Sequence, residues 1–241
     1  MSPKISDIIL LGTDRIHLFD TPLLMCRNQG LSMEQRAAKR VLDIIVSGLG
    51  IIVSSPIMLI IAIAVKAYDG GPVFYLQDRL TYQGKEFRIR KFRSMCVDSE
   101  KNGARLASKH DSRITPVGHV LRNLHLDELP QLFNVFMGDM SLVGPRPERD
   151  VIMQEYEQEI PEFHYRLKVK AGLTGYAQVY GKYNTTPYDK LKLDLFYIEN
   201  YSFLLDIKLL FMTVKIFFQK EVSEGVDDNQ KNALKDSEDK K

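Results

Sequence analysis

The feature that most constrains this chain is a stretch of 22 residues, 44–65, without a single charged side chain. As a straight helix this stretch would be ~33 Å long, which is enough to cross the hydrocarbon core of a bilayer. A membrane-spanning helix is therefore the first interpretation. A buried core helix of a soluble protein is another, since Gly48 and Gly50 would suit close packing anywhere.

Two features of the stretch favour a helix that enters the membrane and returns to the same face. Pro56 removes a backbone hydrogen bond near the middle and kinks the helix, and a preceding serine hydroxyl can cover the carbonyl left unpaired. The ends of a straight span usually differ in positive charge. Here basic residues flank both ends: Lys39, Arg40 and Lys66. We therefore predict a re-entrant helix, broken at Ser55 and Pro56.

Charge and cysteine content narrow the class of protein. The formal net charge is +2, but residues 221–241 hold seven acidic and four basic residues, so the other 220 residues carry +5. Such a surplus suits anionic lipid or phosphate-bearing partners. The two cysteines lie far apart and the five histidines show no metal-ligand spacing, so neither a disulfide framework nor a zinc site is indicated.

The remaining sequence predicts an α+β fold that is mainly helical. Residues 72–93 alternate like two strands joined by a turn at 82–84, and they carry a cluster of basic residues. Thr115 is placed to cap a helix that has Pro116 at its first position. The expected helices cover residues 115–124, 148–160 and 188–219, with glycine-rich irregular chain over 171–187.

The C-terminal helical segment leaves one question open. Residues 202–218 are apolar enough to pack on a core or to lie in a bilayer interface. The polar tail over 221–241 is expected to be disordered.

Asp127 and Glu128 are adjacent carboxylates followed closely by Pro130. Because proline is tolerated in a first turn, the helix should begin at Asp127 or Glu128 and end at Gly138, whose glycine suits a C-terminal cap. Asp127 would then lie at the positive end of the helix, where its pKa is lowered and phosphate is attracted. The alternative is that both carboxylates only cap the helix.

Arg146 is framed by Pro145 and Pro147, which restrict the backbone on both sides. An arginine fixed in this way suits bidentate contact with phosphate or carboxylate. The alternative is that GPRPE is only a stiff loop.

Together these motifs resemble the bacterial polyprenyl-phosphate sugar-1-phosphate transferases, the monotopic phosphoglycosyl transferase superfamily. The resemblance runs in order from KRVLD at 39–43 through GPVFYLQDR, KFRSM at 91–95, LDELPQLFNVFMGDMSLVGPRPE and LTGYAQVYG to DLFYIENYS. The segment with LTGYAQV resembles the catalytic half of the larger members, and residues 19–32 resemble the linker before it. Thr81, Ala171 and Tyr180 stand where the family often has glycine, proline and asparagine, which puts substrate contacts near 171–182 in question.

The resemblance implies an enzyme that transfers a sugar-1-phosphate from a UDP-sugar to polyprenyl (undecaprenyl) phosphate and releases UMP. It implies Asp127 as the nucleophile that carries the phosphosugar, and Glu128 as a neighbouring acid, base or metal partner. It also implies Mg²⁺ on the diphosphate, held by Asp127 with Glu128 as a second candidate ligand. The candidates for binding phosphates or orienting the binding groups are Lys91, Arg93, Arg122, Arg146 and Glu148.

The expected organisation follows from the same resemblance. It comprises a lead segment over 1–38, the membrane helix over 39–67, a cytosolic catalytic domain with a small β-hairpin and interfacial helices over 68–220, and the tail over 221–241. The expected location is the bacterial cytoplasmic membrane, with the catalytic domain on the cytoplasmic face. The expected partners are UDP-sugar, polyprenyl phosphate and membrane lipid, without nucleic acid.

The sequence leaves several points open. It does not name the sugar, for which a hexose such as galactose or glucose is a weak expectation, or the pathway among exopolysaccharide, capsule, O-antigen and glycoconjugate synthesis. The oligomeric state is open, a homodimer included. A glycosyltransferase that releases UDP and a membrane-bound scaffold with a decayed site are the competing functions.

Overall fold

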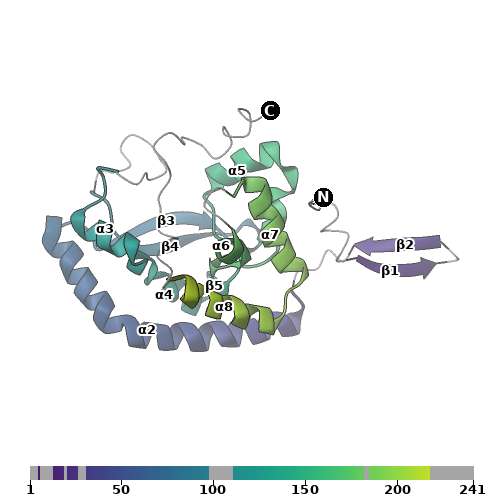
Figure 1. Cartoon of the computed structure of the whole chain (residues 1–241), viewed down its shortest axis with the longest axis horizontal. Helices are drawn as coiled ribbons and strands as arrows, with labels where there is room; N and C mark the ends of the chain where they lie inside the picture. The colour runs from purple at the N-terminus through teal and green to yellow at the C-terminus, as the bar shows by residue number, and fades with distance from the viewer. Residues whose placement is uncertain are drawn as a thin grey trace.

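A computed structural model describes residue 5 and residues 13–18, 21–26, 31–97, 111–181 and 185–217. The tail over 221–241, predicted to be disordered, lies outside these residues. Strands β1 (Thr13–Leu18) and β2 (Thr21–Cys26) pair antiparallel. In Figure 1 this hairpin extends to one side of the remaining structure. The sequence analysis did not predict it, because residues 1–38 were expected only to be a lead segment and no strands were assigned there.

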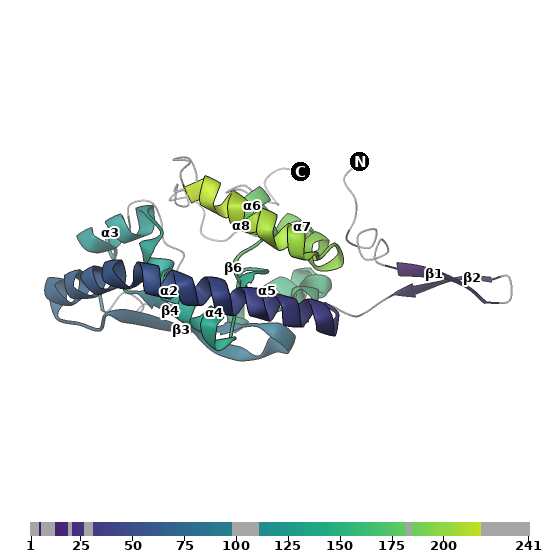
Figure 2. The ribbon, with the colours of Figure 1, turned by 90° about the horizontal axis from the view of Figure 1, so that it is seen from below.

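Helix α2 (Met33–Asp69) is the longest element, with 37 residues. Ser32 and Gln35 form a capping box at its start, and Gly70 ends it in a left-handed conformation. Figures 1 and 2 show α2 running along one whole side of the structure, beside α4 and α8.

Pro56 lies inside α2 without interrupting it. The carbonyl of Ile52 cannot pair with Pro56, and Ser55 Oγ donates a hydrogen bond to it at 2.8 Å. The expected role of a serine beside the proline is thereby confirmed. Figure 1 shows that α2 curves along its length. The predicted break is therefore corrected to a bend within one continuous helix, because the serine hydroxyl satisfies the freed carbonyl.

The first half of α2 turns polar side chains toward the protein and apolar side chains outward. Lys39, Asp43 and Ser47 recur every four residues and are all buried. Lys39 Nζ lies 2.6 Å from Asp206 Oδ2, and Asp43 Oδ1 accepts a hydrogen bond from the backbone of Leu142 at 2.9 Å. The large apolar side chains exposed along α2 include Ile45, Leu49, Ile52, Val53, Leu59, Ile60 and Ile63. This is the reverse of the arrangement on a surface helix of a soluble protein.

The second half of α2 packs on the same body as the first. Met58, Ile61 and Val65 are buried in one cluster with Phe92 and Leu121. Within the described part of the chain, α2 is the one helix long and apolar enough to cross a membrane. Both halves of α2 nevertheless pack against other elements of this same chain.

Strands β3 (Phe74–Leu80) and β4 (Glu86–Phe92) form an antiparallel ribbon, joined by a turn at Tyr82–Gly84. The alternation along β4 buries Phe87 and Ile89 and leaves Arg88 exposed. The two strands and the turn predicted from residues 72–93 are confirmed.

The segment from Thr115 to Gly138 differs in part from expectation. Helix α3 (Pro116–Asn123) is capped by Thr115 as predicted. The single helix expected over 127–138 is instead a 3₁₀ turn, η2 (Leu126–Glu128), followed by α4 (Gln131–Met137) and the left-handed Gly138. Pro130 has no N–H to complete an α-helical ladder, and the bonds here join residues three apart, such as Leu129 N to Leu126 O.

The C-terminal part contains more elements than predicted. The helix expected over 148–160 is α5 (Asp150–Glu159), and a 3₁₀ segment, η3 (Pro161–Lys168), follows it. The supposedly irregular chain contains β6 (Gly172–Thr174), parallel to β5 (Ser141–Val143), and α6 (Tyr176–Tyr180). The long helix expected next is two helices, α7 (Pro187–Glu199) and α8 (Phe203–Phe217).

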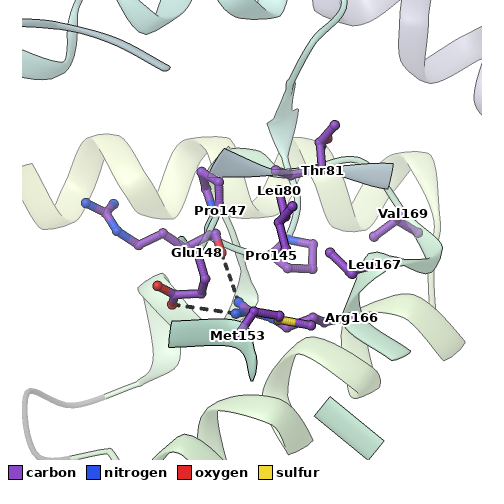
Figure 3. A pocket seen from close by; sticks show the side chains of 11 residues that line it. Leu80, Thr81, Pro145, Pro147, Glu148, Met153, Arg166, Leu167 and Val169 are labelled. Atoms are coloured by element: carbon purple, nitrogen blue, oxygen red, sulfur yellow. Dashed lines mark hydrogen bonds and ion pairs between the residues drawn. The ribbon is translucent and has the colours of Figure 1, made fainter. Parts of the chain in front are cut away.

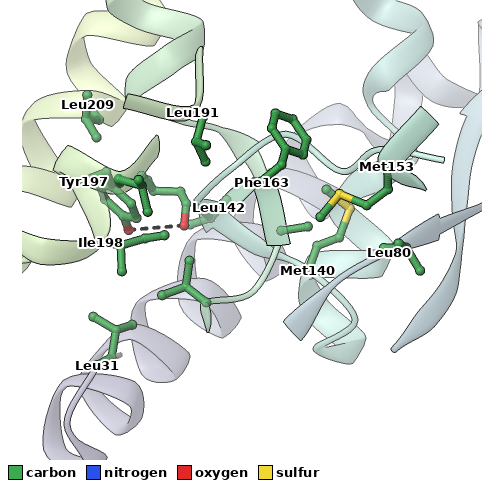
Figure 4. Packing of buried hydrophobic residues seen from close by; sticks show 14 of the residues in the cluster. Leu31, Leu80, Met140, Leu142, Met153, Phe163, Leu191, Tyr197, Ile198 and Leu209 are labelled. Carbon is green, nitrogen blue, oxygen red and sulfur yellow. Dashed lines mark hydrogen bonds between the residues drawn. The ribbon is translucent and has the colours of Figure 1, made fainter. Parts of the chain in front are cut away.

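Core packing, one of the two alternatives for residues 202–218, holds for one face of helix α8, and the bilayer interface stays a prediction for the other. Asp206 and Leu209 are fully buried, whereas Leu204 and Phe211 are 78% and 73% exposed. One face of α8 therefore belongs to the core, which Figure 4 shows around Tyr197 and Leu209, and the opposite face is apolar and open.

Asn134 joins α4 to the free edge of β4. Its Oδ1 accepts a hydrogen bond from Arg90 N at 3.0 Å, its Nδ2 donates to Arg88 O at 2.8 Å, and the residue is completely buried. The side chain thus takes the place of a neighbouring strand, and it fixes α4 and the turn before it against β4.

We predict that Asn134→Ala lowers the free energy of unfolding by about 2–4 kcal/mol, because two buried backbone groups lose their partners. Denaturant unfolding in detergent micelles measures the change. The matched control is Gln154→Ala, which removes an exposed amide on α5 and should change stability little. Equal losses in the two variants would contradict the role of Asn134.

Candidate active site

Asp127 and Glu128 lie in η2, just before α4, and the structure gives them different surroundings. The backbone turns sharply ahead of them, where His125 has a φ of 53°, an uncommon value for a residue other than glycine. Asp127 is 9% exposed, and within the described residues no donor makes a hydrogen bond to its carboxylate.

Burial raises the pKa of Asp127, and the charge on Glu128 acts in the same direction, against the opposing charges of Lys91 and Arg122. The lowered pKa predicted from a helix terminus is wrong. Helix α4 begins only at Gln131, so its first N–H groups do not reach back to Asp127. A carboxylate with a raised pKa is more basic and hence a better nucleophile.

Glu128 is held by two cations. Its Oε1 lies 2.6 Å from Lys91 Nζ and 2.9 Å from Arg146 Nη2. Burial alone would raise the pKa of Glu128, but Arg146 and Lys91 outweigh it and lower the pKa well below the usual value. The two neighbouring carboxyls therefore differ strongly in acidity, an arrangement that assigns them different tasks.

Three of the predicted phosphate-binding cations surround this pair. Lys91 and Arg146 contact Glu128 directly, and Arg122 contributes positive charge at Asp127 while its Nε donates to Ser94 Oγ at 3.1 Å. Burial lowers the pKa of the Lys91 ammonium, an effect that Glu128 opposes. The cluster joins β4, α3, η2 and the loop after β5.

Arg93 lies elsewhere. Its Nη2 pairs with Asp69 at the C-terminal end of α2, and the side chain is 7% exposed. A Cβ atom on Gly71 would collide with its guanidinium, so any other residue at position 71 would displace the Arg93 side chain. The structure therefore places Arg93 as a tether of α2, and its role in phosphate binding stays a prediction.

Glu148 was expected to bind phosphate or to orient a phosphate-binding group. Its carboxylate instead lies beside three cations that were not among those candidates. It lies 2.5 Å from Lys190 Nζ, 3.5 Å from Arg166 Nη1 and 3.8 Å from Arg79 Nη1. Burial would raise the pKa of Glu148, but these cations, Lys190 foremost, lower it to about 2. Figure 3 shows Glu148 and Arg166 facing one another beside the loop.

In the loop over residues 145–148, every backbone carbonyl is a hydrogen-bond acceptor. Each of the four accepts one hydrogen bond, and the donors come from three separate parts of the chain: β3, η3 and β6. The pairs are Gly172 N to Pro145 O at 2.9 Å, Arg166 Nη2 to Arg146 O at 3.0 Å, Arg79 Nη1 to Pro147 O at 3.1 Å, and Leu80 N to Glu148 O at 3.0 Å. Sequence reasoning missed Arg79 and Arg166, although Arg79 lies within the GPVFYLQDR motif.

Two of the departures from the family pattern contact each other. The hydroxyl of Thr81 donates to Asp139 O at 3.0 Å and accepts from Ala171 N at 3.1 Å. A proline at 171 would have no N–H and a glycine at 81 no hydroxyl, so a chain with either of those residues could not form the buried hydrogen bond between Ala171 and Thr81.

The pair of carboxylates fits Mg²⁺ that arrives on a diphosphate. In the described ranges no cluster of three or more His, Cys, Asp or Glu side chains could hold a metal by itself. Mg²⁺ commonly takes one or two protein carboxylates and completes its shell with substrate phosphates and water. Asp127 and the second oxygen of Glu128, neither engaged by a described donor, supply such a set.

Comparison with known proteins defines the family. The profile described as "Bacterial sugar transferase" matches residues 34–220, so the chain belongs to the bacterial sugar transferase family, and the resemblance drawn from the sequence is confirmed.

Three relatives illustrate the range of named substrates. The UDP-N-acetylgalactosamine-undecaprenyl-phosphate N-acetylgalactosaminephosphotransferase of Aeromonas hydrophila is 44% identical over 180 residues, covering 73% of this chain and 43% of the relative. The UDP-glucose:undecaprenyl-phosphate glucose-1-phosphate transferase of Klebsiella pneumoniae is 43% identical, covering 84% and 43%. The undecaprenyl-phosphate galactose phosphotransferase of Salmonella typhimurium is 36% identical, covering 91% and 49%. The chain thus spans less than half the length of each.

We predict a pH-dependent stability effect for Glu148→Gln. The folded-state pKa of Glu148, about 2, lies below the usual 4.5, so the wild-type advantage is present above pH 4.5 and is lost as the pH falls toward 2. The advantage is at most roughly 3 kcal/mol. Denaturant unfolding at pH 6 and pH 3 measures it, with the exposed Glu159→Gln on α5 as control. A pH-independent difference would contradict the ionised cluster.

Proposed function

We propose that this chain is a phosphoglycosyl transferase that moves a sugar-1-phosphate from a UDP-sugar to undecaprenyl phosphate and releases UMP. The observation that carries the proposal is the contrast between Asp127, buried without a hydrogen-bond donor among the described residues, and Glu128, fixed between two cations. The relatives are named for transfer to undecaprenyl phosphate and for different sugars, so the proposal does not specify the sugar.

In the first step, a carboxylate oxygen of Asp127 attacks the phosphorus that bears the sugar. A bond forms between this oxygen and phosphorus, and the bond from phosphorus to the bridging oxygen of the diphosphate breaks. UMP leaves with that oxygen and its electron pair. Because a covalent intermediate divides one difficult displacement into two easier ones, a basic and desolvated carboxylate is well suited to this step.

In the second step, a phosphate oxygen of undecaprenyl phosphate attacks the same phosphorus. The bond from phosphorus to Asp127 breaks, and the carboxylate is restored together with a polyprenyl-diphosphate-sugar. Lys91, Arg122 and Arg146 offset the negative charge that accumulates in both steps, since phosphoryl transfer depends mainly on positioning and charge neutralisation.

Glu128 serves best as an ionised partner rather than as a proton donor, because Arg146 and Lys91 keep its pKa low. It holds these two cations beside Asp127, and its second oxygen joins Asp127 as a candidate ligand for Mg²⁺. When bound, Mg²⁺ would neutralise part of the charge on the diphosphate.

We further propose that α2 is re-entrant, with the catalytic domain on the cytoplasmic face of the bacterial membrane. Lys39 near its beginning pairs with Asp206, and Asp69 at its end pairs with Arg93, both in the same protein body. A straight span would separate these ends by the thickness of the bilayer and place the charged body in hydrocarbon, which is costly. A bent helix with its apolar face in one leaflet avoids that cost and places Asp127 near the lipid headgroups.

We predict that Asp127→Asn abolishes both UMP release and a phosphosugar adduct on the protein, because an amide is a very poor nucleophile. Chromatography separates UMP from UDP, and intact-mass spectra of quenched reactions detect the adduct. Asp150→Asn, at the start of α5, is the control and should keep full activity. Release of UDP would instead indicate a glycosyltransferase, and full turnover by Asp127→Asn would rule out the nucleophile.

We predict that both ends of α2 are accessible only from the cytoplasmic side. Single cysteines at Met33, which is 83% exposed, and at Asp78 on β3 would be placed in a variant with Cys26 and Cys96 replaced by serine. A membrane-impermeant maleimide should label both in inverted vesicles and neither in intact cells. Labelling at position 33 from outside the cell would favour a straight span.

A further inference from the structure

Resting on the proposed function, we infer that Arg79 and Arg166 are positioning residues that hold Arg146 on Glu128. We name the two side chains together the arginine clamp. The clamp acts on the backbone of the GPRPE loop, and neither arginine makes a described contact with Asp127 or Glu128.

The loop cannot fix itself through its own amide groups. Pro145 and Pro147 have no N–H to donate, so the backbone here offers mainly acceptors. The clamp supplies donors at the two central carbonyls, with Arg166 Nη2 at 3.0 Å from Arg146 O and Arg79 Nη1 at 3.1 Å from Pro147 O. The two arginines thus bind the two peptide units that directly follow the Cα atom of Arg146.

Arg166 is a fully enclosed charge. Its side chain is 2% exposed, and its Nε and Nη2 donate to Asp194 Oδ2 at 3.1 and 2.8 Å. A buried ion pair is weak evidence for stability, because its desolvation cost is comparable to its attraction. Only the planar fork of arginine reaches Asp194, the carbonyl of Arg146 and the carboxylate of Glu148 at once.

Arg79 is oriented by a second short network. Its Nε and Nη2 donate to Gln77 Oε1 at 3.0 and 2.6 Å, and Gln77 Nε2 donates to Tyr75 Oη at 2.7 Å. Arginine can only donate, so the amide oxygen of Gln77 must face it. The remaining nitrogen, Nη1, is thereby directed at Pro147 O.

The guanidinium of Arg146 itself lacks such enclosure, since 43% of its side chain is exposed. Its 2.9 Å contact with Glu128 therefore depends on where the backbone holds it. A shift of about 1 Å in a positioned catalytic group can lower the rate by roughly 100-fold. Lysine at position 79 or 166 would keep the charge but could not span the same acceptors.

The test begins with Arg166→Lys in the full chain in detergent micelles. We expect kcat for UMP release to fall roughly 10- to 100-fold with a thermal midpoint near that of the wild type. Arg88→Lys, in the exposed pair with Asp78, is the matched control and should keep its kcat. Unchanged kcat with a lowered thermal midpoint would show a purely structural role and overturn the inference.

A double-mutant cycle tests whether the clamp acts through Arg146. In an Arg146→Lys background, Arg166→Lys should reduce kcat further by less than about 3-fold, because the positioned group is already gone. An equally large loss in both backgrounds would overturn the inference. If Arg166→Lys does not fold, Arg79→Lys, at the partly exposed end of the clamp, replaces it in the same cycle.

A readout independent of turnover separates this inference from the proposed function. In protein with ¹⁵N-labelled arginine, the Nε signal of Arg146, identified by its loss in Arg146→Lys, should move toward that of an unpaired arginine in Arg166→Lys, because Arg146 no longer lies against Glu128. An unchanged Arg146 signal would overturn the clamp. Absence of UMP release by wild-type protein would count against the proposed function alone, because this spectrum does not require catalysis.

Discussion

The structure depends on a helix that buries its polar side and exposes its apolar side. In water, the row of isoleucines, leucines and valines along α2 would be strongly unfavourable, whereas in hydrocarbon it carries no such cost. Lys39, Asp43 and Ser47 face the protein, where Asp206, Ser141 and the backbone of Leu142 satisfy them. These polar contacts fix the rotation of α2, so they also fix which face of the protein carries the exposed apolar row.

The site beside this helix is governed by an uneven distribution of charge. Lys91 and Arg146 both form ion pairs with Glu128. Asp127 is therefore the less stabilised anion of the two. Burial of Asp127 destabilises its negative charge further. Under the proposed function, an incoming diphosphate would meet cations already assembled, and the proposed nucleophile would be the carboxylate with the fewer described partners.

The sequence predicted the elements whose conformation depends on residues close together in the chain. The proline and threonine at the start of α3, the alternation in β3 and β4, and the glycine after α4 each specify a conformation within a few residues. The adjacent carboxylates and Arg146 were chosen as candidates because each stands in a compact motif, and the structure brings Arg146 and Glu128 together.

The parts that were missed depend on contacts between distant residues. Strand β6 forms because β5, some thirty positions earlier, lies beside it, and no periodicity in its glycine-rich sequence announces this. The direction of the Asp127 pKa shift depends on burial by other segments. Glu148 and Arg93 found partners that the sequence does not mark, namely Lys190 and Asp69.

The full occupation of the four carbonyls in the GPRPE loop has a consequence for the order of events. A loop tied to three separate segments is held in one position, so under the proposed function the anion-binding site would keep one shape throughout both half-reactions. The UDP-sugar and undecaprenyl phosphate would then bind at this site one after the other. UMP would have to leave before the lipid phosphate could enter. Such alternation is the kinetic pattern known as ping-pong.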